Sequence, residues 1–161
     1  MSFIRPHGVI YDGANDFFSV TDTARGRISK YASDASSFVE QFGTPGTTGT
    51  DLFFPGSGHG STESNTVTLF ADTRNSLVKR INDNVITNTP GVASTTAIPG
   101  TATGQFYNPE STLVFTDAIT DYLLAANTLN NRVEVFDAAN ADTEIEIPQD
   151  PLDGNFGSPF D

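Results

Sequence analysis

The sequence predicts an all-β protein built from three similar four-stranded units, and three observations support this class. Two landmarks, a proline and an Asp-Thr or Asn-Thr pair, recur about every 50 residues. Between the landmarks lie short apolar stretches that alternate with polar residues, the spacing of half-buried strands. The chain is also rich in threonine, asparagine, aspartate and glycine, which favour strands and turns over helices.

The first landmark is an apolar residue three positions before a proline. The prolines are separated by 49, 54 and 50 residues along the 161-residue chain. The four apolar residues and their prolines are Phe3 and Pro6, Leu52 and Pro55, Phe106 and Pro109, and Phe156 and Pro159.

The second landmark keeps the same period. The segments 20–31, 70–81 and 125–136 align without gaps, and an apolar residue follows each threonine by five and by eight positions. The landmark pairs are Asp22 and Thr23, Asp72 and Thr73, and Asn127 and Thr128. Two landmarks in register over three copies indicate an internal repeat. We expect a single β domain with repeats at about 3–51, 52–105 and 106–155, and the start of a fourth unit at 156–161.

Each repeat contains enough strand signals for four short strands. A hairpin is expected around Asp12-Gly13, and further strands follow the Asx-Thr turns. The expected strand regions are 8–20, 36–42, 65–70, 111–125 and 143–147. Helices at 73–83 and 117–129 are the competing interpretation, because both segments have some helical spacing. Four strands in about 50 residues are typical of a β-propeller blade.

The segment "NTLNNRVEVFD" (127–137) resembles the signature of NHL repeats, in which Asp-Thr, Asn and Arg precede an alternating strand. Two repeats have the arginine, as Arg27 and Arg132, and the second has Leu77 in its place. The resemblance implies a propeller fold and a structural role for these arginines, which would bridge to an aspartate or cover strand carbonyls. It implies little chemistry, because members of one fold carry many functions.

Three blades are fewer than the four to eight of natural propellers. Unpaired blade edges invite association with another chain. We therefore expect closure by oligomerisation, most simply as a six-bladed ring of two chains with two-fold symmetry. The alternatives are a chain that is part of a larger protein and an irregular β domain assembled from three decayed repeats.

Composition excludes several classes of function. The formal charge is −12, from 8 Lys and Arg against 20 Asp and Glu, so nucleic acid is not an expected partner. Cysteine is absent, which excludes disulfides and thiol chemistry. No apolar run is long enough to insert into a membrane, and no signal peptide is visible at the start of the chain.

Candidate functional residues are few. His7, His59 and Glu110 lie near repeat starts, which approach the channel of a propeller, and are weak candidates for binding a metal there. Their spacing does not match a zinc site, so no metal, cofactor or catalytic residue is predicted. The segment 56–64, "GSGHGSTES", lacks the serine-hydrolase and Walker patterns and is predicted to be a flexible loop. The oxygens of 137–144 lack the EF-hand spacing for calcium.

Two aromatic pairs, Phe17-Phe18 and Phe53-Phe54, lie in expected strands and are predicted to be core.

The functional expectation is a non-catalytic structural or interaction protein that binds other protein chains. Its acidic composition and visible lack of a signal peptide favour a surface-exposed virion protein, such as a capsid decoration, knob or tail appendage. A soluble propeller scaffold for a protein partner is the second candidate. A metal-dependent lyase or hydrolase with a channel site is the third.

Overall fold

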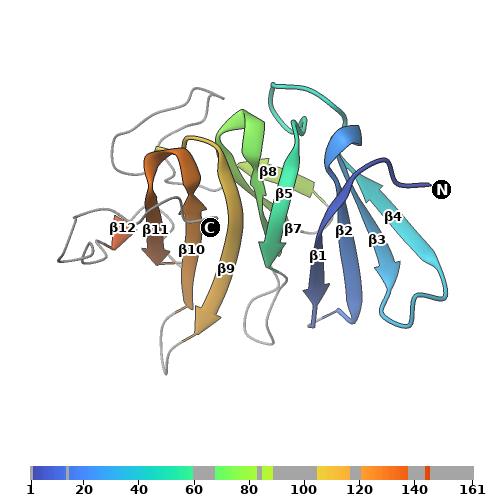
Figure 1. Ribbon diagram of the computed structural model, residues 1–161. Helices are drawn as coiled ribbons and strands as arrows, with labels where there is room; N and C mark the ends of the chain where they lie inside the picture. The colour runs from blue at the N-terminus through green and yellow to red at the C-terminus, as the bar shows by residue number, and fades with distance from the viewer. Residues whose placement is uncertain are drawn as a thin grey trace.

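The structure is a computed structural model that describes residues 2–13, 15–59, 68–82, 85–88, 105–116, 121–137 and 144–145. It contains three antiparallel sheets of four strands, which stand side by side as blades (Figure 1). Blade 1 consists of β1 (Pro6–Asp12), β2 (Phe17–Asp22), β3 (Arg27–Ala32) and β4 (Phe38–Phe42). Blade 2 consists of β5 (Pro55–His59), β6 (Thr68–Asp72), β7 (Leu77–Asn82) and β8 (Val85–Asn88). Blade 3 consists of β9 (Pro109–Thr116), β10 (Asp121–Asn127), β11 (Arg132–Asp137) and β12 (Glu144–Ile145).

Strand order follows chain order in every blade, and the first strands are the innermost, since β5 contacts both β1 and β9. The all-β, three-bladed prediction is therefore confirmed. At the two places where helices were the competing interpretation, the described residues form strands and single 3₁₀ turns. The turns at these two places are η2 (Thr73–Asn75) and η3 (Thr128–Asn130), and blade 1 has the equivalent turn η1 (Thr23–Arg25). No helix in the described part of the chain is long and apolar enough to cross a membrane.

Each 3₁₀ turn follows the Asx residue that ends a second strand and closes with a left-handed residue. That residue is Gly26, Ser76 or Asn131, with φ of 55°, 55° and 52°. In each case its N–H donates to the carbonyl of the threonine that opens the turn. The Asx-Thr landmark thus encodes the connection between the second and third strands.

The hydrophobic cores lie between blades, because a sheet must bury its apolar face against another element. Between blades 1 and 2, the buried side chains are Ile10, Ile28, Phe42, Leu52, Phe70 and Ile81. Between blades 2 and 3, they are Leu69, Val78, Phe106, Val114, Leu123, Ala125 and Phe136. The apolar residues of the proline landmark, Leu52 and Phe106, are completely buried in these two cores.

Two sequence predictions were wrong. Residues 55–59 form strand β5 at the start of a segment predicted to be a flexible loop; residues 60–64 lie outside the described part. The four aromatic residues predicted to be core are not buried: Phe53 is exposed, and Phe17, Phe18 and Phe54 are half-buried. Phe53 and Phe54 precede β5 and pack edge to face at 5.3 Å, whereas Phe18 lies on a sheet face that no blade covers.

Candidate functional site

The side chain that ends the second strand of each blade binds the backbone at the entry to the first strand. In blade 1, Asp22 Oδ1 accepts hydrogen bonds from the N–H groups of Ile4 at 3.2 Å and Arg5 at 3.0 Å. The equivalent bonds run from Phe53 N–H to Asp72 and from Tyr107 N–H to Asn127, each at 2.8 Å. This contact, called the Asx anchor below, holds the proline landmark beside the Asx-Thr turn and explains their constant spacing.

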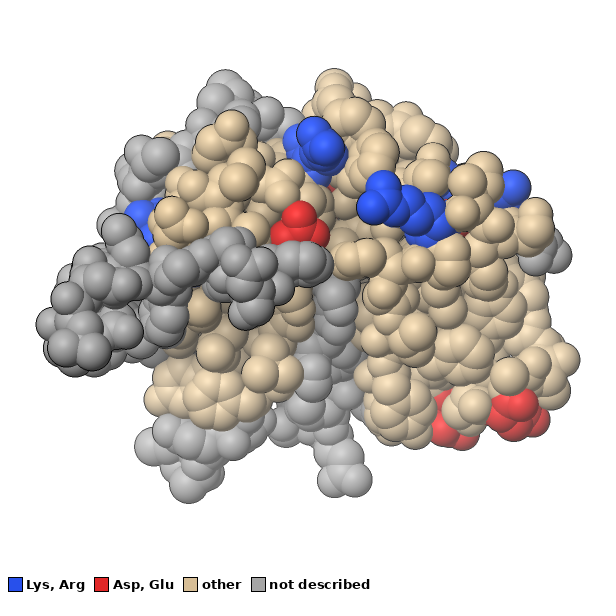
Figure 2. All heavy atoms as spheres, viewed as in Figure 1, with Lys and Arg blue, Asp and Glu red and all other residues tan. Residues whose placement is uncertain are grey.

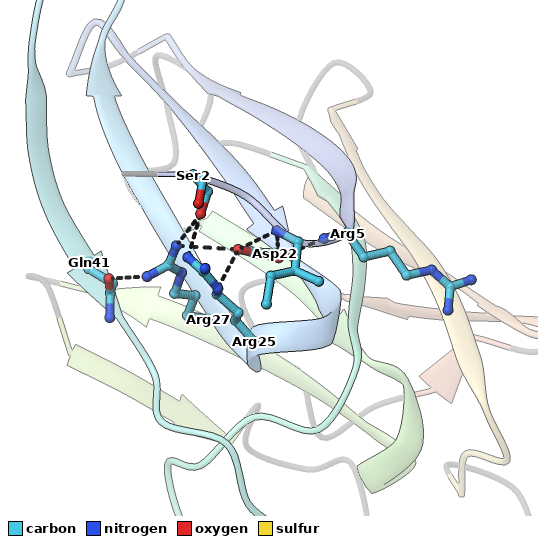
Figure 3. Close-up of polar contacts among 7 residues, drawn as sticks. Ser2, Arg5, Asp22, Arg25, Arg27 and Gln41 are labelled. Carbon is cyan, nitrogen blue, oxygen red and sulfur yellow. Dashed lines mark hydrogen bonds and ion pairs between the residues drawn. The ribbon is translucent and has the colours of Figure 1, made fainter.

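In blade 1, two arginines surround the anchor carboxylate (Figure 3). Arg27 Nη2 lies 3.3 Å from Asp22 Oδ2, and Arg25 Nε lies 3.9 Å from the same oxygen. Arg27 donates to Gln41 Oε1 at 2.9 Å, and both arginines donate to the carbonyl of Ser2. Arg27 therefore connects β2, β4 and the segment that enters β1.

In blade 2, Leu77 replaces the arginine, and Lys79 supplies the positive charge from two residues further along β7. Its Nζ lies 2.7 Å from Asp72 Oδ2 and also donates to the carbonyl of Asp51. Asn75 Nδ2 donates to the same Asp72 oxygen at 2.7 Å. Burial raises the pKa of the Asp72 carboxyl above its ordinary value, against the opposing effects of Lys79 and Asn75.

In blade 3, the acidic residue has moved to a different strand. The anchor is the neutral Asn127, and the carboxylate belongs to Glu134, at the β11 position that Lys79 occupies in β7. Arg132 Nε pairs with Glu134 Oε1, and Asn127 Nδ2 donates to that oxygen at 2.9 Å. Asn127 Nδ2 and Arg132 Nη2 also donate to the carbonyl of Gln105, at 2.8 and 3.4 Å.

A buried carboxylate thus has a cationic partner in each blade, but the residues that supply the two charges differ. Each anchor also satisfies the carbonyl that precedes the apolar landmark residue. The sequence pattern identified Arg27 and Arg132 but missed Lys79 and Glu134. Both missed residues are charged side chains at positions where the strand alternation requires burial, a signal that was visible in the sequence.

A pocket of about 140 Å³ lies where the innermost strands of all three blades begin. The blades contribute equivalent positions to it, before and after the landmark proline. Its lining comprises Arg5 and His7 of blade 1, Phe54 and Gly56 of blade 2, and Asn108 and Glu110 of blade 3, together with Thr23, Thr73 and Arg74 from the turns.

Of the metal candidates, the pocket brings together His7 and Glu110. Strand register places Gly56, not His59, at the position of His7, because Pro6 pairs with Asp22 and Pro55 with Asp72. His59 lies further along β5, opposite Leu69. Within the described ranges no three His, Asp or Glu side chains form a metal-binding group. Residues 138–143, the centre of the calcium candidate segment, lie outside the described part.

In the lining of the pocket, the backbone of Gly56 in blade 2 lies very close to the backbone of Glu110 in blade 3. A Cβ on Gly56 would lie 2.5 Å from the carbonyl oxygen of Glu110 and 2.8 Å from Thr73 Oγ1. Thr73 is 6% exposed, and its Oγ1 has no hydrogen-bond partner among the described residues. Its blade 1 equivalent, Thr23 Oγ1, donates to the carbonyl of Pro55 in the next blade at 2.9 Å.

The second notable surface is the face of blade 1 that points away from blade 2, called its leading face. It carries a cross-strand row of aromatic side chains: Tyr11, Phe18, Tyr31 and Phe38. The rings of Phe18 and Tyr31 stack at 5.3 Å, and Phe38 meets Tyr31 edge to face at 5.7 Å. In blade 3 the same face is covered by blade 2. There Val114, the equivalent of Tyr11, is 3% exposed, whereas Tyr11 is 58% exposed.

Within the described part of the chain, no blade covers the opposite face of blade 3, called its trailing face. Leu113 and Phe115 of β9 are exposed, and Phe115 stacks on Tyr122 at 5.0 Å. Leu113 occupies the register position of Ile10, which blade 2 covers in blade 1. Leu113 is 46% exposed and Ile10 is 1% exposed. Both uncovered faces therefore have the side chains of an inter-blade core without the opposing blade.

The Thr128 side chain lies in the corresponding turn of blade 3. It is the blade 3 equivalent of Thr23, whose hydroxyl bonds the next blade. Thr128 Oγ1 is buried and has no partner among the residues that the structure describes.

No protein-family model matches the sequence, and no curated protein sequence matches it. Solved structures do match. A streptogramin B lyase gives a TM-score of 0.62 at 16% identity, over 89% of this chain and 41% of that chain. A structure of a nidogen/laminin complex gives 0.59 at 13% identity, over 91% and 48%. The β-propeller domain of Swd1 from Myceliophteria thermophila gives 0.50 at 13% identity, over 91% and 43%.

These similarities, together with three radially adjacent four-stranded sheets, define the chain as a β-propeller fold. The chain spans less than half the length of the three matching structures. At such identities the likeness concerns the fold alone. The neighbours include a lyase and a component of a protein complex, so the fold is compatible with both catalysis and protein binding.

Proposed function

We propose that the protein is a non-catalytic propeller scaffold that binds other protein chains through the leading face of blade 1 and the trailing face of blade 3. The observation that supports the proposal most directly is the exposure of two apolar side chains whose equivalents between blades are buried. Tyr11 and Leu113 are exposed, while their equivalents between blades are buried. Fully burying a large apolar side chain contributes about 1.5–3 kcal/mol, so covering each face favours association.

A second copy of the chain is the proposed occupant of both faces. The blade 1–2 and blade 2–3 contacts already pair a trailing face with a leading face, and the same contact between copies continues this pattern. Two copies with two such contacts form a closed six-bladed ring. In that ring the partner's proline carbonyl at position 6 would accept the hydrogen bond of Thr128 Oγ1, as the Pro55 carbonyl accepts that of Thr23.

Molar mass in solution tests the ring directly. Wild-type protein is expected to have twice the 17.2 kDa mass of one chain. Tyr11→Glu blocks the leading face and Leu113→Glu blocks the trailing face, so each variant alone is expected to be monomeric. A mixture of the two variants retains one intact contact, between the trailing face of the first and the leading face of the second, and is expected to form heterodimers.

Leu129→Glu is the control for an added charge, because Leu129 is exposed in turn η3 and belongs to no strand of either face. This variant is expected to remain a dimer. A folded wild-type protein that stays monomeric at all accessible concentrations contradicts the ring. A mixture that stays monomeric contradicts the assignment of the two faces.

The NHL relationship and the virion setting are finer parts of this proposal. The Asp-Thr turns and the anchor arginines support the NHL relationship, and the acidic, cysteine-free composition supports an exposed setting. A low-resolution image of the assembly that contains the protein tests the setting, since a capsid or fibre and an isolated ring look different.

One observation favours the enzymatic alternative, a metal-dependent lyase or hydrolase: His7 and Glu110 line the same pocket. Metal analysis of the purified protein tests it. Near-stoichiometric zinc or calcium that is lost in His7→Ala and Glu110→Gln would support the enzyme and count against a purely non-catalytic scaffold.

A further inference from the structure

We propose that the pocket between the three blades binds one oxyanion group, a carboxylate or a phosphate. Arg5 and Arg74 would supply the positive charge, and the Thr73 hydroxyl would donate a hydrogen bond. This inference goes beyond the scaffold function and does not depend on the ring.

The charge distribution is the first argument. The chain carries −12 overall, yet its cations gather at the turn end of the blades, where the pocket lies (Figure 2). In that view acidic side chains are visible at the opposite end of blade 1, and another acidic group lies near the cations. Of the eight Lys and Arg residues, those at or beside the strand entries and turns are Arg5, Arg25, Arg27, Arg74, Lys79 and Arg132.

Arg5 and Arg74 differ from the other four cations, because neither pairs with a carboxylate of the residues that the structure describes. The other four pair with Asp22, Asp72 or Glu134. Arg74 instead lies over the ring of Phe54, with 5.4 Å between the guanidinium carbon and the ring centroid. This cation–π contact orients the guanidinium without neutralising it. An exposed guanidinium with this orientation is suited to a planar or tetrahedral oxyanion.

Thr73 gives the second, independent argument. A buried hydroxyl without a hydrogen bond costs free energy, and such groups are rare unless a ligand or water satisfies them. Thr73 Oγ1 is such a group among the described residues, and it lies beside Gly56, where a Cβ would come within 2.8 Å of it. The equivalent hydroxyl of Thr23 donates a hydrogen bond to the carbonyl of Pro55.

Pocket size and the remaining polar groups limit the ligand further. A volume of about 140 Å³ is below the ~300–1,000 Å³ of pockets that enclose drug-sized molecules, so a single anionic group fits better than a nucleotide. Glu110 is the one carboxylate of the lining, and its Oε1 accepts a hydrogen bond from Asn108 Nδ2 at 2.8 Å. Its negative charge opposes anion binding, which makes it a test of the sign of the ligand charge.

The experiment is an amide-detected NMR titration with sodium acetate and with sodium phosphate, each against sodium chloride at matched ionic strength. We expect saturable shifts at Gly56, Thr73 and Arg74 with at least one of the two anions. Saturation by acetate alone identifies a carboxylate site, and saturation by phosphate alone identifies a phosphate site. Arg5→Gln and Arg74→Gln are expected to weaken binding tenfold or more, and Glu110→Gln to strengthen it several-fold.

Lys30→Gln is the matched charge control, since Lys30 lies over the Phe17 ring in blade 1 and away from the pocket. It is expected to leave affinity unchanged within twofold. Thr73→Val is expected to weaken binding without lowering the melting temperature. Leu113→Glu is expected to bind the anion normally even as a monomer, which separates this proposal from the ring. The absence of saturable shifts with both anions, equal weakening by Lys30→Gln, or weakening by Glu110→Gln would overturn the proposal.

Discussion

Lys79 Nζ lies 2.7 Å from Asp72 Oδ2, and both side chains are almost completely buried between blades. This pair replaces the half-buried Arg27 of blade 1 with a lysine that is buried in the sheet. Desolvation of two charges is costly, and the pair is tolerated because further donors reach the same carboxylate. Those donors are Asn75 Nδ2 at 2.7 Å and the Phe53 N–H at 2.8 Å.

Replacing Lys79 by methionine is expected to destabilise the protein by about 3–5 kcal/mol, because Asp72 is then left as a buried charge without its cation. Chemical denaturation measures this loss. The control is Asp72→Asn combined with Lys79→Met, which removes both charges and is expected to recover a large part of the loss. If the single and double variants are equally unstable, the ion pair is not the cause.

The same variant makes a pH prediction. Burial already raises the pKa of Asp72, and removing Lys79 raises it further. A carboxyl with a higher pKa in the folded than in the unfolded chain holds a proton that the unfolded chain has lost, so it lowers stability as pH rises above about 4. The stability deficit of Lys79→Met relative to wild type is therefore expected to be smaller at pH 5 than at pH 8. A deficit that shrinks with rising pH would contradict this assignment.

The anchor chemistry is expected to be transferable between blades. A triple variant of blade 2, Asp72→Asn with Leu77→Arg and Lys79→Glu, recreates the blade 3 arrangement of Asn127, Arg132 and Glu134. It is expected to be more stable than the double variant Asp72→Asn with Lys79→Glu, which carries a buried carboxylate without a cation. Denaturation midpoints of the two variants provide the comparison, and equal midpoints would mean that position 77 does not complete the anchor.

These anchors also mark how far the sequence predicts the structure. The Asx-Thr turn was predictable because short polar residues and a following left-handed residue favour a turn. Gly26 and Asn131 are residues that tolerate this conformation, and Ser76 adopts it nonetheless. The predicted bond of the Asx side chain to nearby backbone was wrong, since its oxygen accepts from backbone 17 to 20 residues away in the sequence. The charged partners of the anchors were only partly predictable, because Lys79 and Glu134 act from the third strand at a position where blade 1 has a serine.

The sequence predicted the candidate site less well, because strand register cannot be read from distance to a proline. His7 and His59 looked equivalent by their nearness to a proline, but pairing with the second strand sets the register, and this makes Gly56 the equivalent of His7. The burial of Phe18 was not predictable from its strand. Its exposure depends on whether a blade covers the leading face, which is a property of the assembly and not of local sequence.

Thr23 and Thr73 offer a matched pair of substitutions. Thr23→Val removes the 2.9 Å hydrogen bond to the Pro55 carbonyl between blades 1 and 2 and is expected to cost about 1–3 kcal/mol. Thr73→Val removes a buried hydroxyl without a partner among the described residues, so stability in the absence of anions is expected to stay equal or to rise. Thermal unfolding in chloride buffer measures both. A loss at Thr73 as large as that at Thr23 would indicate that Thr73 already has a protein partner.

Gly26 and Asn131 close equivalent turns with nearly the same backbone, at φ of 55° and 52°, but their surroundings differ. A Cβ at Gly26 would lie 2.6 Å from the carbonyl oxygen of Leu52 and 2.9 Å from Pro45 Cα, whereas Asn131 is exposed. Alanine at either position adopts the left-handed conformation at a cost of about 1–2 kcal/mol relative to glycine. At position 26 the clash with two backbone groups adds about 1–3 kcal/mol.

Gly26→Ala is therefore expected to lower the free energy of unfolding more than Asn131→Ala does, since asparagine already carries part of the left-handed strain. Urea denaturation of the two variants measures the difference. Because Leu52 lies in the core between blades 1 and 2, Gly26→Ala should also shift the NMR signals of that core, including the Phe70 ring. Equal losses at both positions, with an undisturbed core, would mean that backbone strain alone requires Gly26 and that the contact with Leu52 does not.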